Sequence, residues 1–287
     1  MTSTPAVRLL ATDLDGTLLR TDNTISDATR EALGAAEQAG LVIVFVTGRP
    51  PRWLHEVAEA TGHTGIAVGA NGALTYDLHT ETVLDSHPLD ITVLADVTRV
   101  LREKIPDIRF AMEYGLDFGF EPEYRHDWEI LPATDRIGRQ LPVATSAQLE
   151  ELLSKPAVKL LAKGRGLDPD AFMDEVEQLI GEQVTVTRSG HSALVEISAT
   201  GITKASGLAA FARSQDIPRE QVAAVGDMPN DIPMLEWAGR SFAVANAHPS
   251  ARAAAKRILD RSNDEDAVAH LIGELLAELE RHATGID

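Results

Sequence analysis

Short apolar segments alternate with helical segments at both ends of the chain, and this alternation limits the possible folds more than any other feature. Near the N-terminus we expect strands at Val7–Thr12, Leu41–Val46 and Ile66–Val68, separated by helices at Asp27–Ala39 and Pro51–Thr61. Leu41–Val46 is a six-residue apolar run, which is too short for a helix and suits a strand buried on both faces. This order predicts a parallel α/β layer with right-handed crossovers.

The same alternation returns in the last third of the chain, whereas the middle has a different pattern. In the last third we expect helices at Thr203–Ser214, Ile232–Ala238, Pro249–Lys256 and Asp264–His282, and strands at Val222–Val225 and Phe242–Val244. In the middle we expect helices at Asp90–Lys104 and Pro169–Ile180, and extended segments at Ile108–Met112, Phe118–Phe120, Val158–Ala162 and Val184–Thr187. The sequence therefore predicts an α/β protein whose Rossmann-like parallel-sheet core, residues 1–86 and 189–287, is interrupted by an α+β domain, residues 87–188.

Composition excludes several classes of function. The net charge is −18 with no Lys/Arg-rich block, so we expect no nucleic-acid partner and no anionic membrane partner. No apolar run approaches the roughly 20 residues of a transmembrane helix, and we expect no secretory signal. Cysteine is absent, which excludes disulfides, thiolate metal ligands and thiol nucleophiles. These features are compatible with a cytoplasmic protein, and they do not indicate an oligomeric state.

Polar residues follow several of the expected strands. Asp13 and Asp15 come after the first strand, Thr47-Gly48-Arg49 after the second, and Asp227 with Asn230 and Asp231 after Val222–Val225. Lys204 opens an expected helix, where the helix N-terminus already favours an anion. Each of these features alone is typical of an ordinary turn or helix start. Ligands of open α/β sheets bind beyond the carboxyl ends of the strands, so we expect the set to form one site.

A site with several carboxylates and one lysine favours a particular chemistry. Two carboxylates about 4 Å apart repel by roughly 1 kcal/mol in water and by about 4 kcal/mol at an effective dielectric constant of 20, so a cation is expected among them. Oxygen ligands without clustered His or Cys favour Mg²⁺. A carboxylate beside Mg²⁺ can attack phosphorus, and a second carboxylate can protonate the leaving alcohol and later activate water.

These residues resemble the four ordered motifs of the haloacid dehalogenase (HAD) superfamily. The motifs are Asp13-Leu14-Asp15-Gly16-Thr17-Leu18, Thr47-Gly48-Arg49, Lys204 and Gly226-Asp227-x-x-Asn230-Asp231. Asn71-Gly72-Ala73, Met234-Leu235 and Ala245-Asn246-Ala247 are similar to the Cof-type branch, subfamily IIB. In that branch a C2-type cap domain is inserted between the second and third motifs. The resemblance therefore implies a HAD core carrying such a cap.

The resemblance also implies a role for each motif residue. It makes Asp13 the nucleophile and a Mg²⁺ ligand, and Asp15 the general acid/base and a Mg²⁺ ligand through its carbonyl oxygen. It assigns phosphate binding to the Thr47-Gly48-Arg49 tip and to Lys204, and contact with the phosphate region to Asn230. It makes Asp227 a further metal ligand and Asp231 a support of the metal.

The expected function is Mg²⁺-dependent hydrolysis of small phosphomonoesters, such as sugar phosphates or phosphorylated cofactors, through an aspartyl-phosphate. The alternatives are a phosphomutase of the same architecture, which would need a bisphosphate activator, and a non-catalytic sensor of a phosphorylated ligand. In the cap, residues near expected strand ends are candidates for contacting the leaving group: Glu113, Tyr114, Arg188, Ser189 and His191. The small number of basic residues in the cap favours a neutral leaving group.

Overall fold

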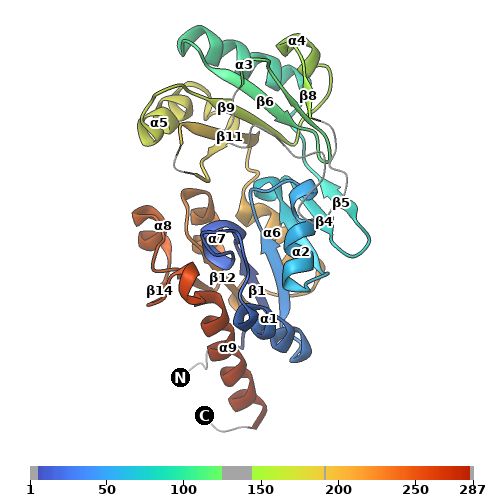
Figure 1. Cartoon of the computed structure of the whole chain (residues 1–287), viewed down its shortest axis with the longest axis vertical. Helices are drawn as coiled ribbons and strands as arrows, with labels where there is room; N and C mark the ends of the chain where they lie inside the picture. Colours follow the sequence, from blue (N-terminus) through green and yellow to red (C-terminus); the bar gives the residue numbers. More distant parts are fainter. Residues whose placement is uncertain (1–5, 125–143, 191, 285–287) are drawn as a thin grey trace.

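The computed structural model describes residues 6–124, 144–190 and 192–284 of the chain. Two sheets, each with its own hydrophobic core, lie one above the other in Figure 1. The lower, eight-stranded sheet has the order β14-β13-β12-β1-β2-β3-β4-β5, and the upper, six-stranded sheet has the order β10-β11-β9-β6-β7-β8. We call the part built on the eight-stranded sheet the core and the part built on the six-stranded sheet the cap. The chain passes from core to cap and back once, as expected for an inserted domain.

The core sheet places the first strand at its centre. Its parallel strands are β1 (Leu9–Thr12), β2 (Val42–Val46), β3 (Ile66–Gly69), β12 (Val222–Gly226), β13 (Arg240–Ala243) and β14 (Arg257–Ile258). The antiparallel hairpin β4 (Leu74–Asp77) and β5 (Thr82–Ser86) extends the sheet beyond β3. Strand β1 lies between β12 and β2, with Leu9 opposite Val222 and Val42. The chain segments that follow these three strands therefore meet at one edge.

Helices pack on the core sheet in two groups. One group is α1 (Asp27–Gln38), α2 (His55–Thr61) and α9 (Ala267–Thr284), and the other is α6 (Lys204–Ser214), α7 (Ile232–Trp237) and α8 (Pro249–Ala254). Figure 1 shows the sheet between the two groups. Ser26 caps α1 by accepting a hydrogen bond from the Thr29 N–H, as its sequence position predicts. This covering of both faces explains the continuous apolar character of β1 and β2.

The cap is a mostly antiparallel sheet with helices on its outer face, away from the core (Figure 1). Its strands are β6 (Arg109–Glu113), β7 (Phe118–Phe120), β8 (Thr145–Ser146), β9 (Lys159–Lys163), β10 (Val184–Thr187) and β11 (Leu194–Ala199), and its helices are α3 (Ile91–Lys104), α4 (Leu149–Leu152) and α5 (Pro169–Ile180). Leu160 and Ala162 of β9 belong to the cap's hydrophobic core, whereas Lys159 and Leu161 line a cavity on the opposite face. This alternation follows from the two-residue period of a strand.

The predicted fold class is confirmed, with differences in single elements. The expected helix Pro51–Thr61 is a short helical turn, Pro51–Trp53, followed by α2. Strand β11 lies in the range 189–287 that the sequence assigned to the core, yet it pairs with β9 and β10 of the cap sheet. By strand pairing, the chain thus leaves the cap after Ala199 rather than after residue 188. The remaining division of the chain into domains stays a prediction.

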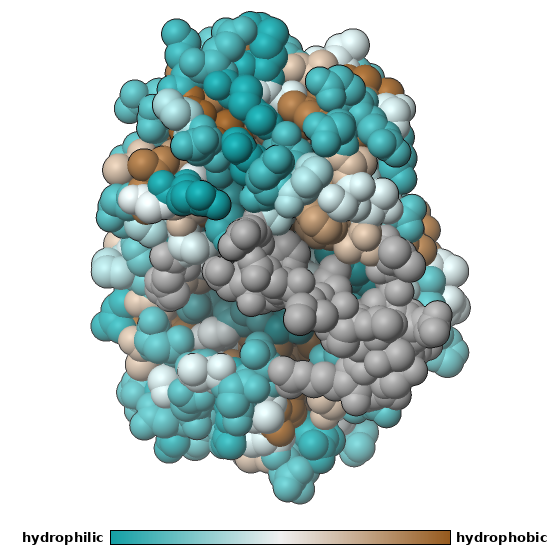
Figure 2. All heavy atoms as spheres, turned by 45° about the horizontal axis from the view of Figure 1, so that its top comes forward, coloured by the Kyte–Doolittle hydropathy of each residue, from teal (hydrophilic) through white to brown (hydrophobic). Residues whose placement is uncertain are grey.

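Large apolar side chains are few on the surface of the described residues. Among residues 6–124, 144–190 and 192–284 there is no helix with the length and apolar character needed to cross a bilayer. The face shown in Figure 2 is mostly hydrophilic, with small separate hydrophobic areas. Exposed large apolar side chains in the described ranges are Val83, Leu84, Ile91, Leu116, Leu167 and Ile258. They are scattered over several elements of core and cap, which is ordinary for a protein surface.

Candidate active site

Asp13 and Asp15 lie directly beyond the central strand of the core sheet. The Asp13 N–H continues the pairing of β1 with β12 by donating to the Val225 carbonyl over 3.0 Å. The chain then turns at Gly16, which has a φ of 76°. A Cβ atom at Gly16 would lie 2.5 Å from Oδ2 of Asp227. Glycine thus allows the left-handed turn and the close approach to Asp227 at the same time.

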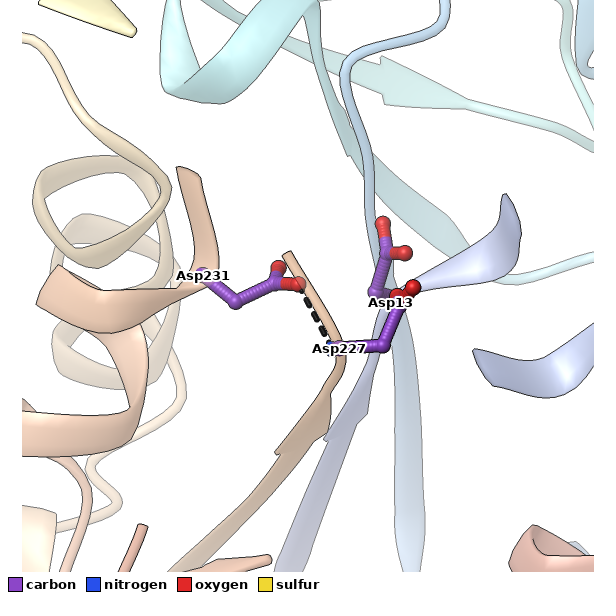
Figure 3. A group of neighbouring side chains, drawn as sticks. All are labelled: Asp13, Asp227 and Asp231. Carbon is purple, nitrogen blue, oxygen red and sulfur yellow. Dashed lines mark hydrogen bonds between the residues drawn. The ribbon is translucent and has the colours of Figure 1, made fainter. Parts of the chain in front are cut away.

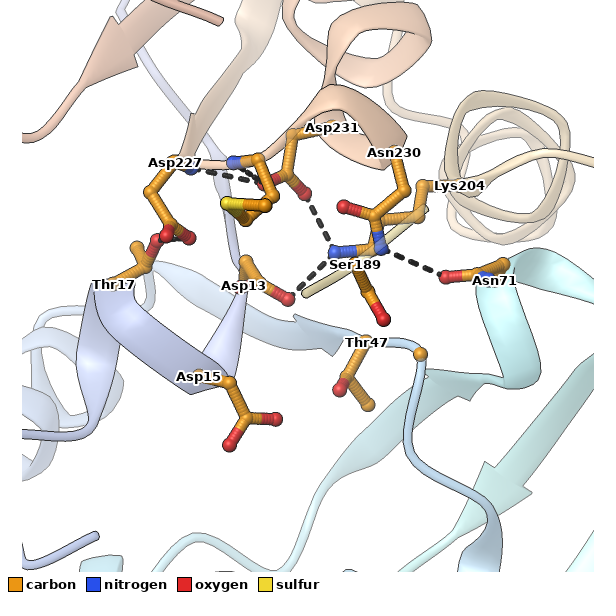
Figure 4. A network of polar contacts seen from close by, with 12 residues as sticks. Asp13, Asp15, Thr17, Thr47, Asn71, Ser189, Lys204, Asp227, Asn230 and Asp231 are labelled. Carbon is orange, nitrogen blue, oxygen red and sulfur yellow. Dashed lines mark hydrogen bonds and ion pairs between the residues drawn. The ribbon is translucent and has the colours of Figure 1, made fainter. Parts of the chain in front are cut away.

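Lys204 forms the buried positive centre of the site (Figure 4). Thr203 caps α6 and accepts a hydrogen bond from the Ser206 N–H, which places Lys204 at the first helical position. The Lys204 Nζ lies 2.6 Å from Oδ1 of Asp13 and 2.6 Å from Oδ1 of Asp231. Burial alone would lower the pKa of Lys204, but the two carboxylates outweigh this effect and raise it. The side chain is therefore an ammonium ion.

Asp227 and Asp231 come from the segment after β12 and face Asp13 (Figure 3). One carboxylate oxygen of each of these three residues lies within 4.8 Å of the others. The Thr17 hydroxyl donates to Oδ1 of Asp227 over 2.7 Å. Oδ2 of Asp231 accepts hydrogen bonds from the backbone N–H groups of Asp227 and Met228, both 2.9 Å long. With Lys204 on Oδ1, both oxygens of Asp231 are engaged.

The negative charge of this cluster exceeds what Lys204 compensates. Burial raises the pKa of Asp13 well above its usual value, and the nearby carboxylates of Asp231, Asp227 and Asp15 add to this rise while Lys204 opposes it. Burial and Asp231 raise the pKa of Asp227 to about 7. An oxygen-only donor set with surplus charge fits a hard divalent cation such as Mg²⁺. Since both oxygens of Asp231 already have partners, Asp13 and Asp227 are the side chains suited to hold the cation.

The tip after β2 lies beside the two N-terminal aspartates. Thr47 is fully buried, and its Oγ1 accepts a hydrogen bond from the Arg49 N–H over 3.1 Å. Arg49 donates hydrogen bonds from two nitrogens to the Asp15 carboxylate, and its Nε lies 2.8 Å from Oδ2. The carbonyl of Gly48 accepts a hydrogen bond from Lys159 of the cap over 2.6 Å. The structure thus brings all residues of the Thr47-Gly48-Arg49 tip next to Asp13 and Asp15.

Asn230 completes the set of predicted residues. Its Nδ2 donates to Oδ1 of Asn71 over 3.0 Å, while its own Oδ1 is buried without a hydrogen-bond partner among the described residues. The same Asn71 also contacts Glu196 and Thr187 of the cap. Sequence reasoning singled out the Asn71-Gly72-Ala73 motif only as a family feature and gave it no role. Its contacts with both domains became visible only in the structure.

A cavity of about 910 Å³ lies between core and cap and is lined by some of these residues. Its core side includes Asp13, Asp15, Arg49 and Asn230, and its cap side includes Glu113, Lys159, Leu161, Ser189 and Glu196. A cavity of this size accommodates a small organic molecule. The aspartates at its floor therefore face a space in which a phosphorylated compound fits.

The expected cap candidates divide into two groups. Glu113 and Ser189 line the cavity, although Glu113 is bound by Arg52 and Ser189 donates to Glu196 over 2.9 Å. Tyr114 and Arg188 do not line it, because Tyr114 donates to the Leu152 carbonyl over 2.6 Å and Arg188 pairs with Asp170. His191 lies outside the described residues. Sequence reasoning missed Lys159 and Glu196, which only the alternation along β9 and β11 would have pointed into the site.

Comparisons of sequence and of structure each find relatives of the chain. The family model for haloacid dehalogenase-like hydrolases matches residues 10–272. The chain is 29% identical over 277 residues to the 5-amino-6-(5-phospho-D-ribitylamino)uracil phosphatase of Bacillus subtilis strain 168, covering 93% of this chain and 96% of that protein. It is 29% identical over 277 residues to the pyridoxal phosphate phosphatase of Escherichia coli strain K12, covering 92% and 97%. A solved structure described as the HAD subclass IIB sugar phosphatase BT4131 has a TM-score of 0.78 at 22% identity, covering 93% and 98%.

Proposed function

The chain belongs to the haloacid dehalogenase-like hydrolases, in their Cof-type branch, and on this basis we propose that it hydrolyses small phosphomonoesters with Mg²⁺ through an aspartyl-phosphate. The observation that carries the proposal is the buried cluster of Asp13, Lys204 and Asp227 beneath a cavity of about 910 Å³. Relatives named as phosphatases of phosphorylated small molecules support the substrate class. A cytoplasmic location is part of the same proposal.

Asp13 is the proposed nucleophile. One of its carboxylate oxygens attacks phosphorus, the new O–P bond forms, and the bond between phosphorus and the leaving alcohol oxygen breaks. Lys204 lies 2.6 Å from Oδ1 of Asp13. Its ammonium group can therefore stabilise the negative charge that develops on the phosphoryl oxygens. Thr47, the Gly48 backbone and Asn230 would hold the phosphoryl group in place from the other sides.

Asp15 is the proposed general acid and base. Its half-exposed carboxylate lies on the cavity wall, where Arg49 orients it. In the first step Asp15 gives a proton to the leaving alcohol, and in the second step it takes one from a water molecule. That water attacks phosphorus, the bond to Asp13 breaks, and inorganic phosphate leaves with the Asp13 carboxylate regenerated.

A Mg²⁺ ion fits the donor set described above. The side chains of Asp13 and Asp227 and the carbonyl oxygen of Asp15 would hold it, and Asp231 would orient this set through its hydrogen bonds to the backbone. When bound, Mg²⁺ neutralises the surplus charge of the carboxylates and polarises the phosphoryl group. Asp13 would then stay ionised, as a nucleophile must, despite the burial that raises its pKa.

The leaving group would enter the cap side of the cavity. There the positive charge of Lys159 is paired with Glu196 and the negative charge of Glu113 with Arg52. These described residues thus offer paired charges and hydroxyl groups to the leaving group. They do not offer an unpaired cation that could bind a second phosphate on it. We expect a largely neutral leaving group, such as a sugar, a polyol or a small cofactor.

The test is phosphate release from a panel of about a hundred phosphomonoesters by the protein and by its Asp13→Asn variant, with Mg²⁺ and with EDTA. We expect Mg²⁺-dependent release by the protein and loss of turnover in the variant by roughly 10³-fold or more, because the amide cannot attack phosphorus. The amide keeps the shape of the side chain, so the variant should fold normally.

Two results would contradict this proposal. Activity of Asp13→Asn close to that of the unchanged protein would remove Asp13 as nucleophile. Absence of release from every compound would leave the phosphomutase and the phospho-ligand sensor as alternatives. A requirement for a bisphosphate activator would then identify the mutase.

A further inference from the structure

The turn at Ala70–Gly72 contacts three parts of the core that carry proposed phosphate-binding residues. The Asn71 N–H donates to the Thr47 carbonyl over 3.0 Å, which ties the turn to the tip after β2. The Asn71 side chain accepts a hydrogen bond from Asn230 over 3.0 Å. Gly72 packs against Thr203, so closely that a Cβ atom at Gly72 would lie 2.0 Å from the Thr203 carbonyl oxygen. The turn thus lies against Thr47, Asn230 and the helix start that carries Lys204.

The backbone of Asn71 has a left-handed conformation, and the residue is buried. Asn71 has a φ of 57° and is 1% exposed. This left-handed conformation is uncommon for a residue with a side chain, and Asn and Asp tolerate it best. The amide therefore reaches its partners from a fixed turn, and an aspartate can replace it without changing the backbone.

The other end of the Asn71 amide reaches the cap. Its Nδ2 donates to Oε2 of Glu196 on β11. Oε1 of the same glutamate accepts hydrogen bonds from Lys159 on β9, 3.3 Å away, and from Ser189, 2.9 Å away. Lys159 and Glu196 are 3% and 6% exposed. One buried network thus runs from the cap through Asn71 to Asn230.

We infer that Asn71 is a positioning residue that couples the seating of the cap to the phosphate site, with Glu196 as its partner in the cap. When the cap is seated, Glu196 fixes the Asn71 amide, and the amide oxygen then holds Asn230 toward the phosphoryl group. When the cap lifts, Asn71 loses the contact that orients it. This inference rests on the proposed function only for the role of Asn230; the link between Asn71 and the cap stands on the contacts alone.

Exchanging donor and acceptor tests the link. Asn71→Asp keeps an acceptor for Asn230 but places a carboxylate against Glu196, and Glu196→Gln alone places two amide groups against each other. In the double variant Asn71→Asp/Glu196→Gln, the glutamine amide can donate to the aspartate while its oxygen still faces Lys159 and Ser189. The total charge of the pair is then the same as in the unchanged protein. We expect each single variant to lose about tenfold in kcat/KM, mainly through a higher KM, and the double variant to return to within about threefold.

A second measurement reports the cap without using catalysis. The chain has no cysteine, so Glu31→Cys on α1 and Gln178→Cys on α5, both exposed, can carry a spin-label pair that reports the distance between core and cap. We expect Asn71→Asp to broaden this distance distribution toward longer values, and Glu196→Gln in the same chain to restore it. Thermal unfolding of all variants shows that each is folded.

The outcomes separate this inference from the proposed function. If the loss of kcat/KM in the double variant equals the product of the losses in the two single variants, and the label distance does not recover, the coupling is overturned. Recovery of both readouts supports it. If the unchanged protein releases no phosphate from any compound, the proposed function fails, and the label distances alone still decide whether Asn71 and Glu196 hold the cap.

Discussion

The charge of Asp227 is expected to change near neutral pH, because its pKa is raised to about 7. Burial, together with Asp231, raises its pKa from 3.8 to about 7, against the opposing effects of Thr17 and Lys204. Between these two values the folded protein binds more protons at this position than the unfolded chain does. The stability contributed by this group therefore falls as pH rises from about 4 to about 7 and stays low above that. A bound cation would remove this penalty.

We predict that Mg²⁺ binds more tightly and stabilises the protein more at pH 8 than at pH 6. At pH 6 an aspartate with a pKa of about 7 is ionised in about one molecule in ten, so the apparent affinity should be about tenfold weaker than at pH 8. Calorimetric titration with Mg²⁺ at pH 6, 7 and 8 measures this difference. Asp227→Asn should lower the affinity and flatten its pH dependence, and equal affinity of the unchanged protein at all three values would refute the prediction.

The residues that the structure brings together were predictable to different degrees. Asp13, Lys204 and Asp227 stand in ordered motifs at strand ends or at a helix start, so their meeting follows from the parallel order of the strands. Lys159 and Glu196 stand in no motif and reach the cavity from a second sheet. The alternation along β9 and β11 gives the face of the cap sheet on which they lie, but it does not show how that sheet sits over the core.

At the scale of the elements, the turn between β3 and β4 packs closely against the start of α6 because Gly72 has no side chain. We predict that Gly72→Ala displaces the turn and lowers both stability and activity, because its Cβ would lie 2.0 Å from the Thr203 carbonyl oxygen at a φ of 98°. Gly201→Ala is the matched control, since Gly201 also has a positive φ, 76°, but no atom within 4 Å of a Cβ. The control should cost only backbone strain, about 1 kcal/mol.

Urea unfolding and phosphate release measure the two glycine variants side by side. We expect Gly72→Ala to lose at least about 2 kcal/mol of unfolding free energy, as overpacked sites commonly do, and to lose activity as well. Equal losses in the two variants would show that the contact with Thr203 has no effect beyond the left-handed backbone.

Most elements of the core were predictable because their sequences carry one clear period. The buried strand β2 and the capped helix α1 lie within about one residue of their expected ends. Strand β5 was missed because all five of its residues are exposed, which leaves no apolar alternation to detect. Strand β11 was missed because it lies between the predicted domain boundary and the Lys204 motif. Its Val195 and Ile197 pack in the hydrophobic core of the cap.

At the scale of the whole molecule, a buried ion pair joins core and cap. Arg52, in the turn after β2, binds Glu113 at the end of β6, and both side chains are at most 2% exposed. The guanidinium also lies over the rings of Trp53 and Phe118, 4.7 and 4.9 Å from their centroids. Removal of one partner from such a pair commonly costs about 3–5 kcal/mol, because the remaining charge is left buried. We expect the cap of such a variant to lift, so that water reaches that charge.

We predict that Glu113→Ala loosens the cap more than it destabilises either hydrophobic core. Small-angle X-ray scattering should show a larger radius of gyration, while the core sheet keeps its unfolding transition. Glu103→Ala serves as control, because it removes an exposed carboxylate that pairs with Arg99 on the same helix. An unchanged radius of gyration in Glu113→Ala would show that the ion pair does not hold the cap.

The strand order of the core sheet has a consequence for folding of the chain during its synthesis on the ribosome. Strand β1 leads directly into Asp13, the proposed nucleophile, yet one of its two neighbours, β12, is made only after all the cap strands. Until β12 leaves the ribosome, β1 has one unpaired edge, and pairing between strands so distant in sequence is slow. The six cap strands, in contrast, can find all their partners earlier. We therefore expect the nascent chain to complete its cap sheet before the two neighbours of β1 are both in place, and an interrupted chain that ends before β12 to lack the proposed site.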